Sequence, residues 1–133
     1  SIKVTNKDNL IYDSNKEYLS IKFIDVDILN SNKISLNEDI ISIYLFANDC
    51  KEVSKNIKNT EYVRSIDIDT GIEVLDENCF NKSINLRNII LPSNLESIEE
   101  NIFAYCDKLS TICYMGSQEE FEKITIDKTI KTI

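Results

Sequence analysis

Two consecutive stretches decide the fold: GIEVLDENCFNKSINLRNIILPSN at residues 71–94 and NLESIEENIFAYCDKLSTICYMGS at residues 94–117. Aligned without a gap, they place Phe80 opposite Phe103 and Ile89 opposite Ile112, and the offset is 23 residues in each case. A fixed period of this length indicates a solenoid, in which each unit stacks only on its neighbours.

The same period continues toward the N-terminus. Apolar residues fill the corresponding positions of two preceding units, with Val63, Ile66 and Ile68 in one, Ile40, Ile43 and Leu45 in the other, and Ile57 and Ile34 at the position of Phe80. A further copy, made of Tyr18, Ile21 and Phe23, fits if the step shortens to 22 residues. The sequence therefore predicts about four to five coils of this repeat.

Each unit contains one strand of the type L-x-x-I-x-L, as in residues 86–91. Ile89 and Leu91 are two residues apart, so they share one face of the strand. A turn at residues 92–94 and a return segment that carries Phe80 or Phe103 complete the unit. Because a single unit would leave its apolar face in water, the units must stack in parallel. We predict a β-rich solenoid of the α/β leucine-rich-repeat class, with a parallel sheet and short helical or turn segments on the return side.

Residues 98–112, IEENIFAYCDKLSTI, resemble the BspA-type leucine-rich repeats, whose usual form is close to I-x-x-x-A-F-x-x-C-x-x-L-x-x-I-x-L-P. Residues 114–124, YMGSQEEFEKI, resemble a segment that often closes such arrays. The resemblance covers about residues 63–124, and upstream units depart from it, with Ser83 at the cysteine position. Family members are commonly surface or secreted adhesion-like proteins of bacteria and some protists. The resemblance implies protein binding and a place at the cell surface or outside the cell, with the cytoplasm as the alternative.

The C-terminal end of the array carries a helix signal. Residues 117–120, Ser-Gln-Glu-Glu, fit a capping box in which Ser117 is the N-cap and Glu120 reaches back to it. Phe121 and Ile124 are three residues apart and would share the face that covers the last coil. We predict a short capping helix over residues 117–124, within a C-terminal cap of residues 117–133.

The N-terminal part of the chain is predicted as strands and a cap over residues 1–38, ahead of repeats at 39–116 in one single domain. Residues 2–4 and 10–12 flank a turn-forming segment at 6–9. Apolar residues alternate through Leu19, Ile21 and Phe23, and the parity then shifts at Ile24. Such a shift predicts a bulge or a corner between coils.

Composition excludes several function classes. Fifteen basic against 23 acidic residues give a net charge of −8, which argues against nucleic acid or an anionic membrane and is compatible with a basic protein partner. The absence of His removes Ser-His-Asp and Cys-His catalytic pairs, and two glycines cannot form a Gly-rich phosphate loop. The longest apolar stretch, residues 40–47, is too short to span a membrane. We predict a non-catalytic chain without a cofactor.

Two D-x-D pairs, Asp25 with Asp27 and Asp67 with Asp69, have a spacing seen in calcium loops. Neither has the glycine and distant glutamate of an EF-hand, so we favour solvent-facing carboxylates over a metal site. The triplet at residues 81–83, Asn-Lys-Ser, is a glycosylation sequon that matters only in a eukaryotic secretory path.

The four cysteines are predicted to be free thiols, because no two of them share a repeat position. Cys79 aligns with Ile102, an interior position, and the family resemblance implies that Cys106 is buried. Cys113 aligns with Ile90, so we expect it to project outward from its strand and to be labelled most readily. Cys50 belongs to no repeat position that the others share.

The outward positions of the strands form the candidate binding surface. Two columns are expected: Ser42, Ser65, Asn88 and Thr111 in the first, and Tyr44, Asp67, Ile90 and Cys113 in the second. The second column mixes aromatic, acidic and apolar side chains, which suits protein recognition; an ordinary exposed sheet is the alternative. The hypothesis is an adhesion-like protein-binding module. The alternatives are a structural or assembly piece of a larger array, and a small acidic inhibitor of a basic protein.

Overall fold

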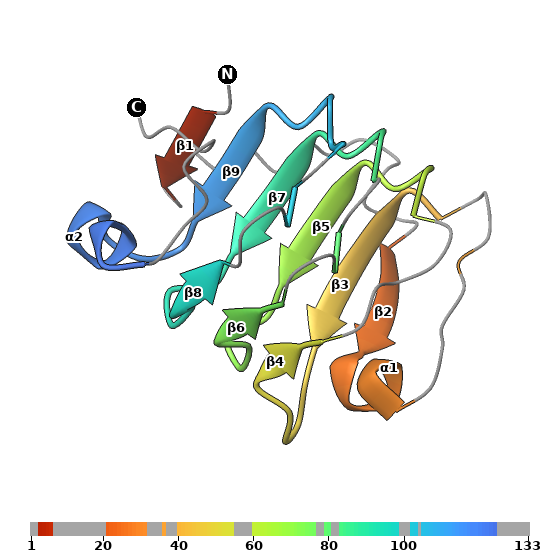
Figure 1. Ribbon diagram of the computed structural model, residues 1–133, viewed down its shortest axis with the longest axis horizontal. Coiled ribbons are helices and arrows are strands. Elements are labelled where there is room, and N and C mark those ends of the chain that lie inside the picture. The colour runs from red at the N-terminus through yellow and green to blue at the C-terminus, as the bar shows by residue number, and fades with distance from the viewer. Residues whose placement is uncertain are drawn as a thin grey trace.

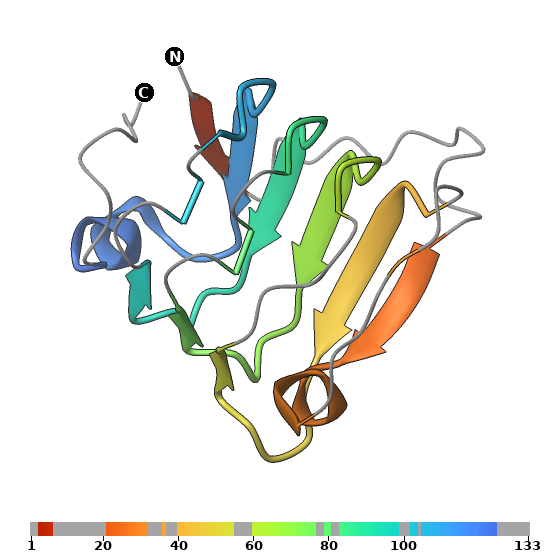
Figure 2. The ribbon, with the colours of Figure 1, turned by 45° about the vertical axis from the view of Figure 1, so that its right-hand side comes forward.

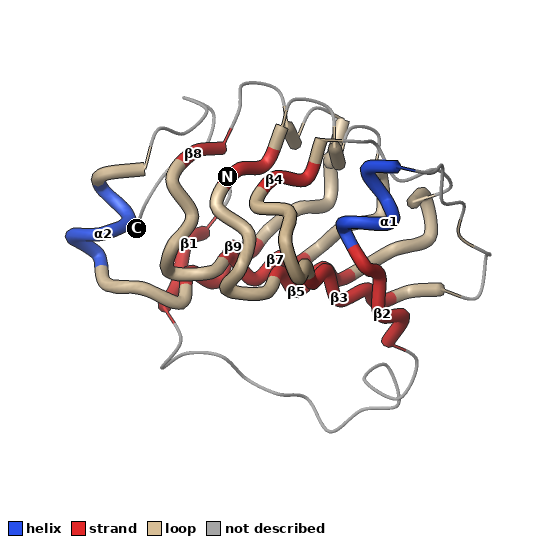
Figure 3. The backbone as a smooth tube through the Cα atoms, turned by 90° about the horizontal axis from the view of Figure 1, so that it is seen from below, coloured by secondary structure: helices blue, strands red, loops and turns tan. Residues whose placement is uncertain are grey.

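Parallel strands on two sides of a coil make up the computed structural model (Figure 1), which describes residues 3–6, 21–31, 36, 40–54, 60–76, 79–80, 83–98, 102–103 and 105–124. A six-stranded sheet has the order β1-β9-β7-β5-β3-β2, and a three-stranded sheet has the order β4-β6-β8. Figure 3 shows β4 and β8 on the side of the coil opposite the large sheet. The strands of the large sheet are β1 (Lys3–Asn6), β2 (Ile21–Asp25), β3 (Ser42–Phe46), β5 (Ser65–Ile68), β7 (Asn88–Leu91) and β9 (Thr111–Tyr114).

The small sheet was not anticipated from the sequence. Its strands are β4 (Glu52–Val53), β6 (Val74–Leu75) and β8 (Ser97–Ile98). Three coils therefore carry a strand on both sides. At the two ends of the array a helix stands beside the small sheet (Figures 1 and 2), α1 (Val26–Ser31) near β4 and α2 (Gln118–Glu122) near β8.

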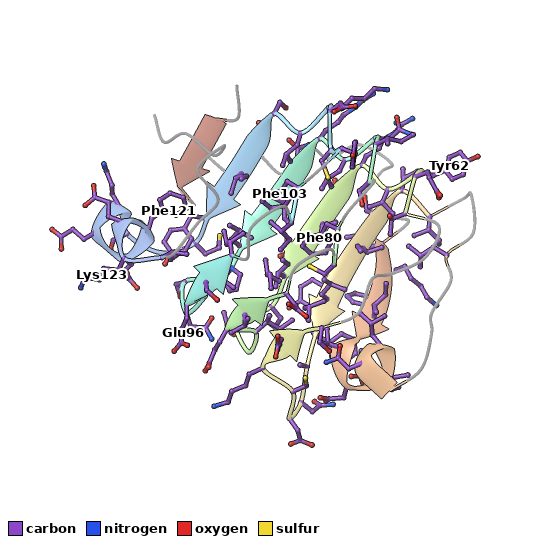
Figure 4. All side chains as sticks on the ribbon, in the orientation of Figure 1. Tyr62, Phe80, Glu96, Phe103, Phe121 and Lys123 are labelled. Carbon is purple, nitrogen blue, oxygen red and sulfur yellow. The ribbon has the colours of Figure 1, made fainter. Side chains whose placement is uncertain are left out.

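The strands of the large sheet pair with the predicted repeat period: from β3 to β9, each residue stands opposite the residue 23 positions further along the chain. Four isoleucines stand opposite one another across the neighbouring strands, and each is at most 1 % exposed: Ile43, Ile66, Ile89 and Ile112. Phe80 and Phe103 stack inside the coil with ring centroids 6.3 Å apart and planes 10° from parallel, and Figure 4 shows the two rings side by side there. The parallel-sheet solenoid and its phenylalanine stack are confirmed.

A buried polar pair joins two coils at one repeat position. Ser83 Oγ and Thr60 Oγ1 are 3.0 Å apart, and both side chains are buried. Cys106 holds the same position in the next coil, and its thiol donates to the carbonyl oxygen of Phe80 over 3.3 Å. Each of these three polar side chains thus has a hydrogen-bond partner, which allows it to occupy an interior position.

The register of the first strand differs from the prediction. β2 pairs Ile21 with Ser42 and Ile24 with Leu45, so the step of this copy is one position shorter than the sequence alignment assumed. A shift of one residue moves every side chain to the other face of the sheet. Ile24 is therefore buried, whereas Phe23 is 65 % exposed. Where a bulge or a corner between coils was expected, helix α1 begins at Val26 directly after the strand.

Helix α1 covers the first coil and is held by polar contacts. The Asp27 carboxylate accepts hydrogen bonds from the backbone N–H groups of Asn48, Asp49 and Cys50 over 2.6–3.1 Å. Asn30 accepts from the N–H of Ser54 at 3.1 Å and donates to the carbonyl oxygen of Glu52. These bonds fasten the helix to the loop on either side of β4. They make α1 the cap of this end of the array.

The other end is closed by the predicted capping helix. Ser117 Oγ accepts from the Glu120 N–H and the Glu120 carboxylate accepts from the Ser117 N–H, each over 3.1 Å, so the capping box is confirmed. Phe121 and Ile124 are buried, and the Phe121 ring meets that of Tyr114 at 5.2 Å.

Strand β1 lies at this same end. It pairs in parallel with β9, at the opposite edge of the sheet from β2, which follows it in the sequence. Part of the predicted N-terminal strand is therefore present, but it closes the end of the array opposite to the one that α1 covers. The second predicted strand, at residues 10–12, lies outside the described residues.

Candidate protein-binding surface

The predicted outer columns of the large sheet exist as continuous rows. Residues of the first column stand opposite one another in the register of β3, β5, β7 and β9, and so do those of the second. In the first row Asn88 is exposed, while Ser65 and Thr111 are half-buried. In the second row Tyr44, Asp67 and Ile90 are half-buried. The alternation of side chains along a strand accounts for both rows.

Two of the predicted surface residues are not accessible. Ser42 is buried, and Cys113 is only 3 % exposed although its register is that of Ile90. The expectation that Cys113 carries the most exposed thiol is wrong. The most exposed of the four thiols is that of Cys50, which is half-buried. Its sulfur contacts Asn30 Nδ2 at 2.8 Å.

The other thiols are free and buried. Burial raises the pKa of all three, to about 11 for Cys106, with smaller contributions from nearby acidic side chains; the three are Cys79, Cys106 and Cys113. A thiolate is the reactive form of cysteine, so a raised pKa lowers reactivity at neutral pH. None of these three therefore has the features of a nucleophile.

Three aromatic side chains gather on the outer face where β2 meets β3. The Phe23 ring meets the Tyr44 ring edge to face at 5.6 Å, and the Tyr44 and Phe46 rings stack at 6.5 Å. We call Phe23, Tyr44 and Phe46 the aromatic cluster. Phe23 is the most exposed large apolar side chain among the described residues. Edge-to-face and stacked contacts are arrangements that aromatic rings prefer, and they contribute to stability beyond the burial of the rings.

An acidic pair, Asp67 and Asp69, borders the aromatic cluster. The Tyr44 hydroxyl donates a hydrogen bond of 2.8 Å to Asp69 Oδ1. Burial, this hydrogen bond and the two carboxylates raise the pKa of Tyr44 to about 12. Burial and the charge of Asp69 raise the pKa of Asp67. Among the residues that the structure describes, neither Asp67 nor Asp69 forms an ion pair with a basic side chain, whereas Lys51 pairs with Glu73 over 3.7 Å.

Sequence reasoning identified Tyr44 and Asp67 and missed the other two rings. The step assumed for the first copy was one position too long, and it placed Phe23 inside the coil. Phe46 lies two residues after Tyr44 and shares its face by alternation, a signal that the sequence contains. The repeat pattern does not point to Phe46, because the residues at the same position of the following units, Asp69, Pro92 and Met115, have no common character.

The D-x-D pairs have roles in hydrogen bonding. Asp25 accepts from the Asp27 N–H at 2.9 Å at the start of α1, Asp27 holds the loop after β3, and Asp69 accepts from Tyr44. Across the described residues, no group of three or more Cys, Asp or Glu side chains could hold a metal ion. Of the sequon, Asn81 lies outside the described residues, and Ser83 is fully buried.

Comparison with known families places the chain. The family model described as "BspA type Leucine rich repeat region" matches residues 23–133 in six copies. The chain belongs to the BspA-type leucine-rich repeat family. As a BspA-type repeat protein it is a repeat module of a generally non-catalytic kind, and such modules typically mediate contacts between proteins. Bacterial members are typically associated with the cell surface.

The match begins at Phe23, within β2. It therefore includes most of the strand whose register differs from the one predicted from the sequence. Comparison with curated proteins gave no match, and neither did comparison with solved structures. In the portion of the chain that the structure describes, no helix has the length and apolar character needed to cross a membrane.

Proposed function

We propose that this chain is a non-catalytic, adhesion-like protein-binding module at the cell surface or outside the cell, and that it binds its partner on the outer face of the large sheet. The observation that carries the proposal is the aromatic cluster, with Phe23 65 % exposed. Aromatic side chains are the commonest anchors of protein interfaces, and an array already ordered before binding loses little entropy.

The acidic pair supports a partner segment rich in Lys or Arg. The like charges of Asp67 and Asp69 oppose each other, since the charge of Asp69 raises the pKa of Asp67. A guanidinium or ammonium group on this face would relieve that repulsion and could lie over an aromatic ring. Complementary charge mainly speeds association, so Asp67 should affect the association rate constant more than the affinity.

The size of the face indicates how the partner would bind. Six strands spaced about 4.8 Å apart make a sheet only about 24 Å wide. A stable interface covers roughly 800 Å² on each partner. The partner therefore also contacts the turns that enter the strands, where Tyr62 precedes β5 and Ile84 precedes β7 as exposed apolar side chains; Figure 4 shows Tyr62 at that edge.

A matched pair of variants tests this function. Phe23→Ala removes the exposed ring of the aromatic cluster, and Tyr105→Ala removes a ring of nearly the same exposure, 64 %, outside the large sheet. Immobilised parent and variant chains are used to capture surface and secreted proteins of the source organism or its host, and bound proteins are quantified by mass spectrometry.

We expect Phe23→Ala to reduce the specifically captured partner at least tenfold, as an interface anchor should, while the melting temperature falls by no more than a few degrees. Tyr105→Ala should capture as much as the parent. Equal capture by the parent and Phe23→Ala would exclude the outer face as the site and would direct attention to the turns. Asp67→Asn should slow association and weaken its dependence on salt.

A further inference from the structure

Strand β1 occupies the place of one more repeat strand. Its four residues run parallel to β9, with Lys3 opposite Thr111 and Asn6 opposite Tyr114. Val4 holds the register position of Ile112, which is the position of the buried isoleucine ladder. The backbone of β9 is thus paired on both edges, by β7 on one side and by β1 on the other.

Strand β1 is an edge strand of the large sheet and is far in the sequence from β9, the strand that it pairs with. The strand is four residues long and is paired along one edge only. Sequential strands usually lie side by side, whereas β1 and β2 lie at opposite ends of this sheet. The edge of an unpaired strand is a template for any other extended chain. If β1 leaves, β9 becomes such an edge.

Chain length allows β1 to dock on another molecule. Residues 7–20 connect β1 to β2. Across the sheet these strands are about 24 Å apart at ~4.8 Å per strand. Fifteen residue steps can span up to roughly 50 Å. The connection is therefore about twice as long as the crossing of its own sheet requires, which leaves chain length for β1 to pair with another molecule.

We propose that the outer edge of β9 is a strand-docking site whose partner is β1 of a second copy of this chain. Two copies that exchange β1 form a closed dimer in which each gives and receives one strand. Both copies keep every strand pair of the single molecule, because the exchanged β1 meets the same residues of β9. The contact is separate from the aromatic cluster, which lies at the other end of the sheet.

The opposition of Thr5 and Cys113 supplies a test specific for exchange. Directly opposed residues of neighbouring strands lie about 4.8 Å apart, within the Cα range of a disulfide. A donor chain carries Thr5→Cys together with Cys113→Ser, and the acceptor is the native chain. A disulfide between the new thiol of the donor and Cys113 of the acceptor can form only between copies.

Donor and acceptor are mixed at several concentrations under mild oxidation, and the linkage is identified by peptide mapping. We expect a mixed dimer joined through Cys113, with a yield that rises with concentration. A control donor with Val4→Cys and Cys113→Ser places its thiol at the neighbouring register position, which alternates to the other face. Its yield should be at least tenfold lower. Absence of the mixed dimer, or equal yields from both donors, would overturn the proposal.

A second measurement guards against a donor that does not fold. Sedimentation of the native chain should show a dimer fraction that grows with concentration, and Val4→Pro should reduce it at least tenfold, since proline interrupts strand pairing. A native chain that sediments as a monomer throughout, and a Thr5→Cys chain that links to Cys113 only within one molecule, would show that β1 stays on its own sheet. Either result would refute exchange.

Discussion

Replacement of Phe80 by alanine tests whether stacking between coils holds the array together. The Phe80 side chain is completely buried, and its ring stacks on Phe103 in the next coil. A buried Phe covers about 150–250 Å² of apolar surface, which at about 25 cal/mol per Å² amounts to roughly 4–6 kcal/mol. Alanine keeps a small part of that surface, and measured Phe→Ala losses in cores are about 3–5 kcal/mol.

We therefore expect Phe80→Ala to lower the free energy of unfolding by about 4 kcal/mol. A domain of this kind has roughly 5–15 kcal/mol in total, so the variant remains folded with a reduced margin. Equilibrium unfolding in urea, followed by circular dichroism, measures the loss as a shift of the midpoint. Phe103→Ala should cost slightly less, because Phe103 retains 9 % exposure.

The control for this experiment is Phe23→Ala, which removes the same group from the outer face; it loses only the edge-to-face contact with Tyr44, so it should change stability by about 1 kcal/mol or less. A double-mutant cycle of Phe80 and Phe103 isolates the ring stack, for which we expect a coupling of about 0.5–1.5 kcal/mol. If Phe80→Ala and Phe23→Ala were equally harmless, the coil interior would be wrongly assigned. If the coupling were zero, the stack would contribute only by burial.

Three further outcomes follow from the structure. Brief alkylation of the native chain should label Cys50 first and leave the three buried thiols unlabelled, which mass spectrometry of the intact chain and of its peptides will show. Backbone hydrogen bonds lower the pKa of Asp27. The stability that this carboxylate contributes is therefore present above about pH 4 and is lost as the pH falls through its lowered pKa. Under those acidic conditions, hydrogen exchange of the Cys50 amide should speed up before that of core amides. The pKa of Tyr44 is raised to about 12, so the neutral phenol favours the folded state and this contribution is lost as the pH rises through that value. When the absorbance of tyrosinate is followed against pH, Tyr44→Phe should remove the step at the highest pH.

The repeating part of this fold was predictable because the inward strand positions are chemically uniform. Ile43, Ile66, Ile89 and Ile112 are the same residue at the same step, and stacking forces identical positions into contact. The phenylalanine stack and the capping box follow for similar reasons, since each depends on local spacing. The small sheet was missed because its strands are two residues long, too short for an alternating pattern to be recognised.

The ends could not be predicted from periodicity. The first coil has a shorter step than the coils after it, and the only local signal for this is the parity change at Ile24. That change is compatible with a bulge or with a corner between coils, and it does not reveal that a helix begins at Val26. The position of β1 beside β9 is a contact between residues far apart in the sequence, such as Val4 and Ile112, and no short-range pattern contains it. For the same reason the aromatic cluster could not be predicted, because Phe23 lies on the outer face only when β2 has its observed register.

A consequence of repeat stacking is that the outer surface carries the information that distinguishes one coil from the next. Inward positions must be apolar, or polar with a hydrogen-bond partner in the next coil as Thr60 and Ser83 are, because otherwise the contacts between neighbouring coils are lost. Outward positions carry no such restriction, and along one row they change from Tyr44 to Asp67 to Ile90. Aromatic contacts occur at the β2–β3 end of this row, next to the acidic pair. A ligand that bound every coil alike would require a repeated surface, so the observed change of character favours one localised partner site over an extended repetitive one.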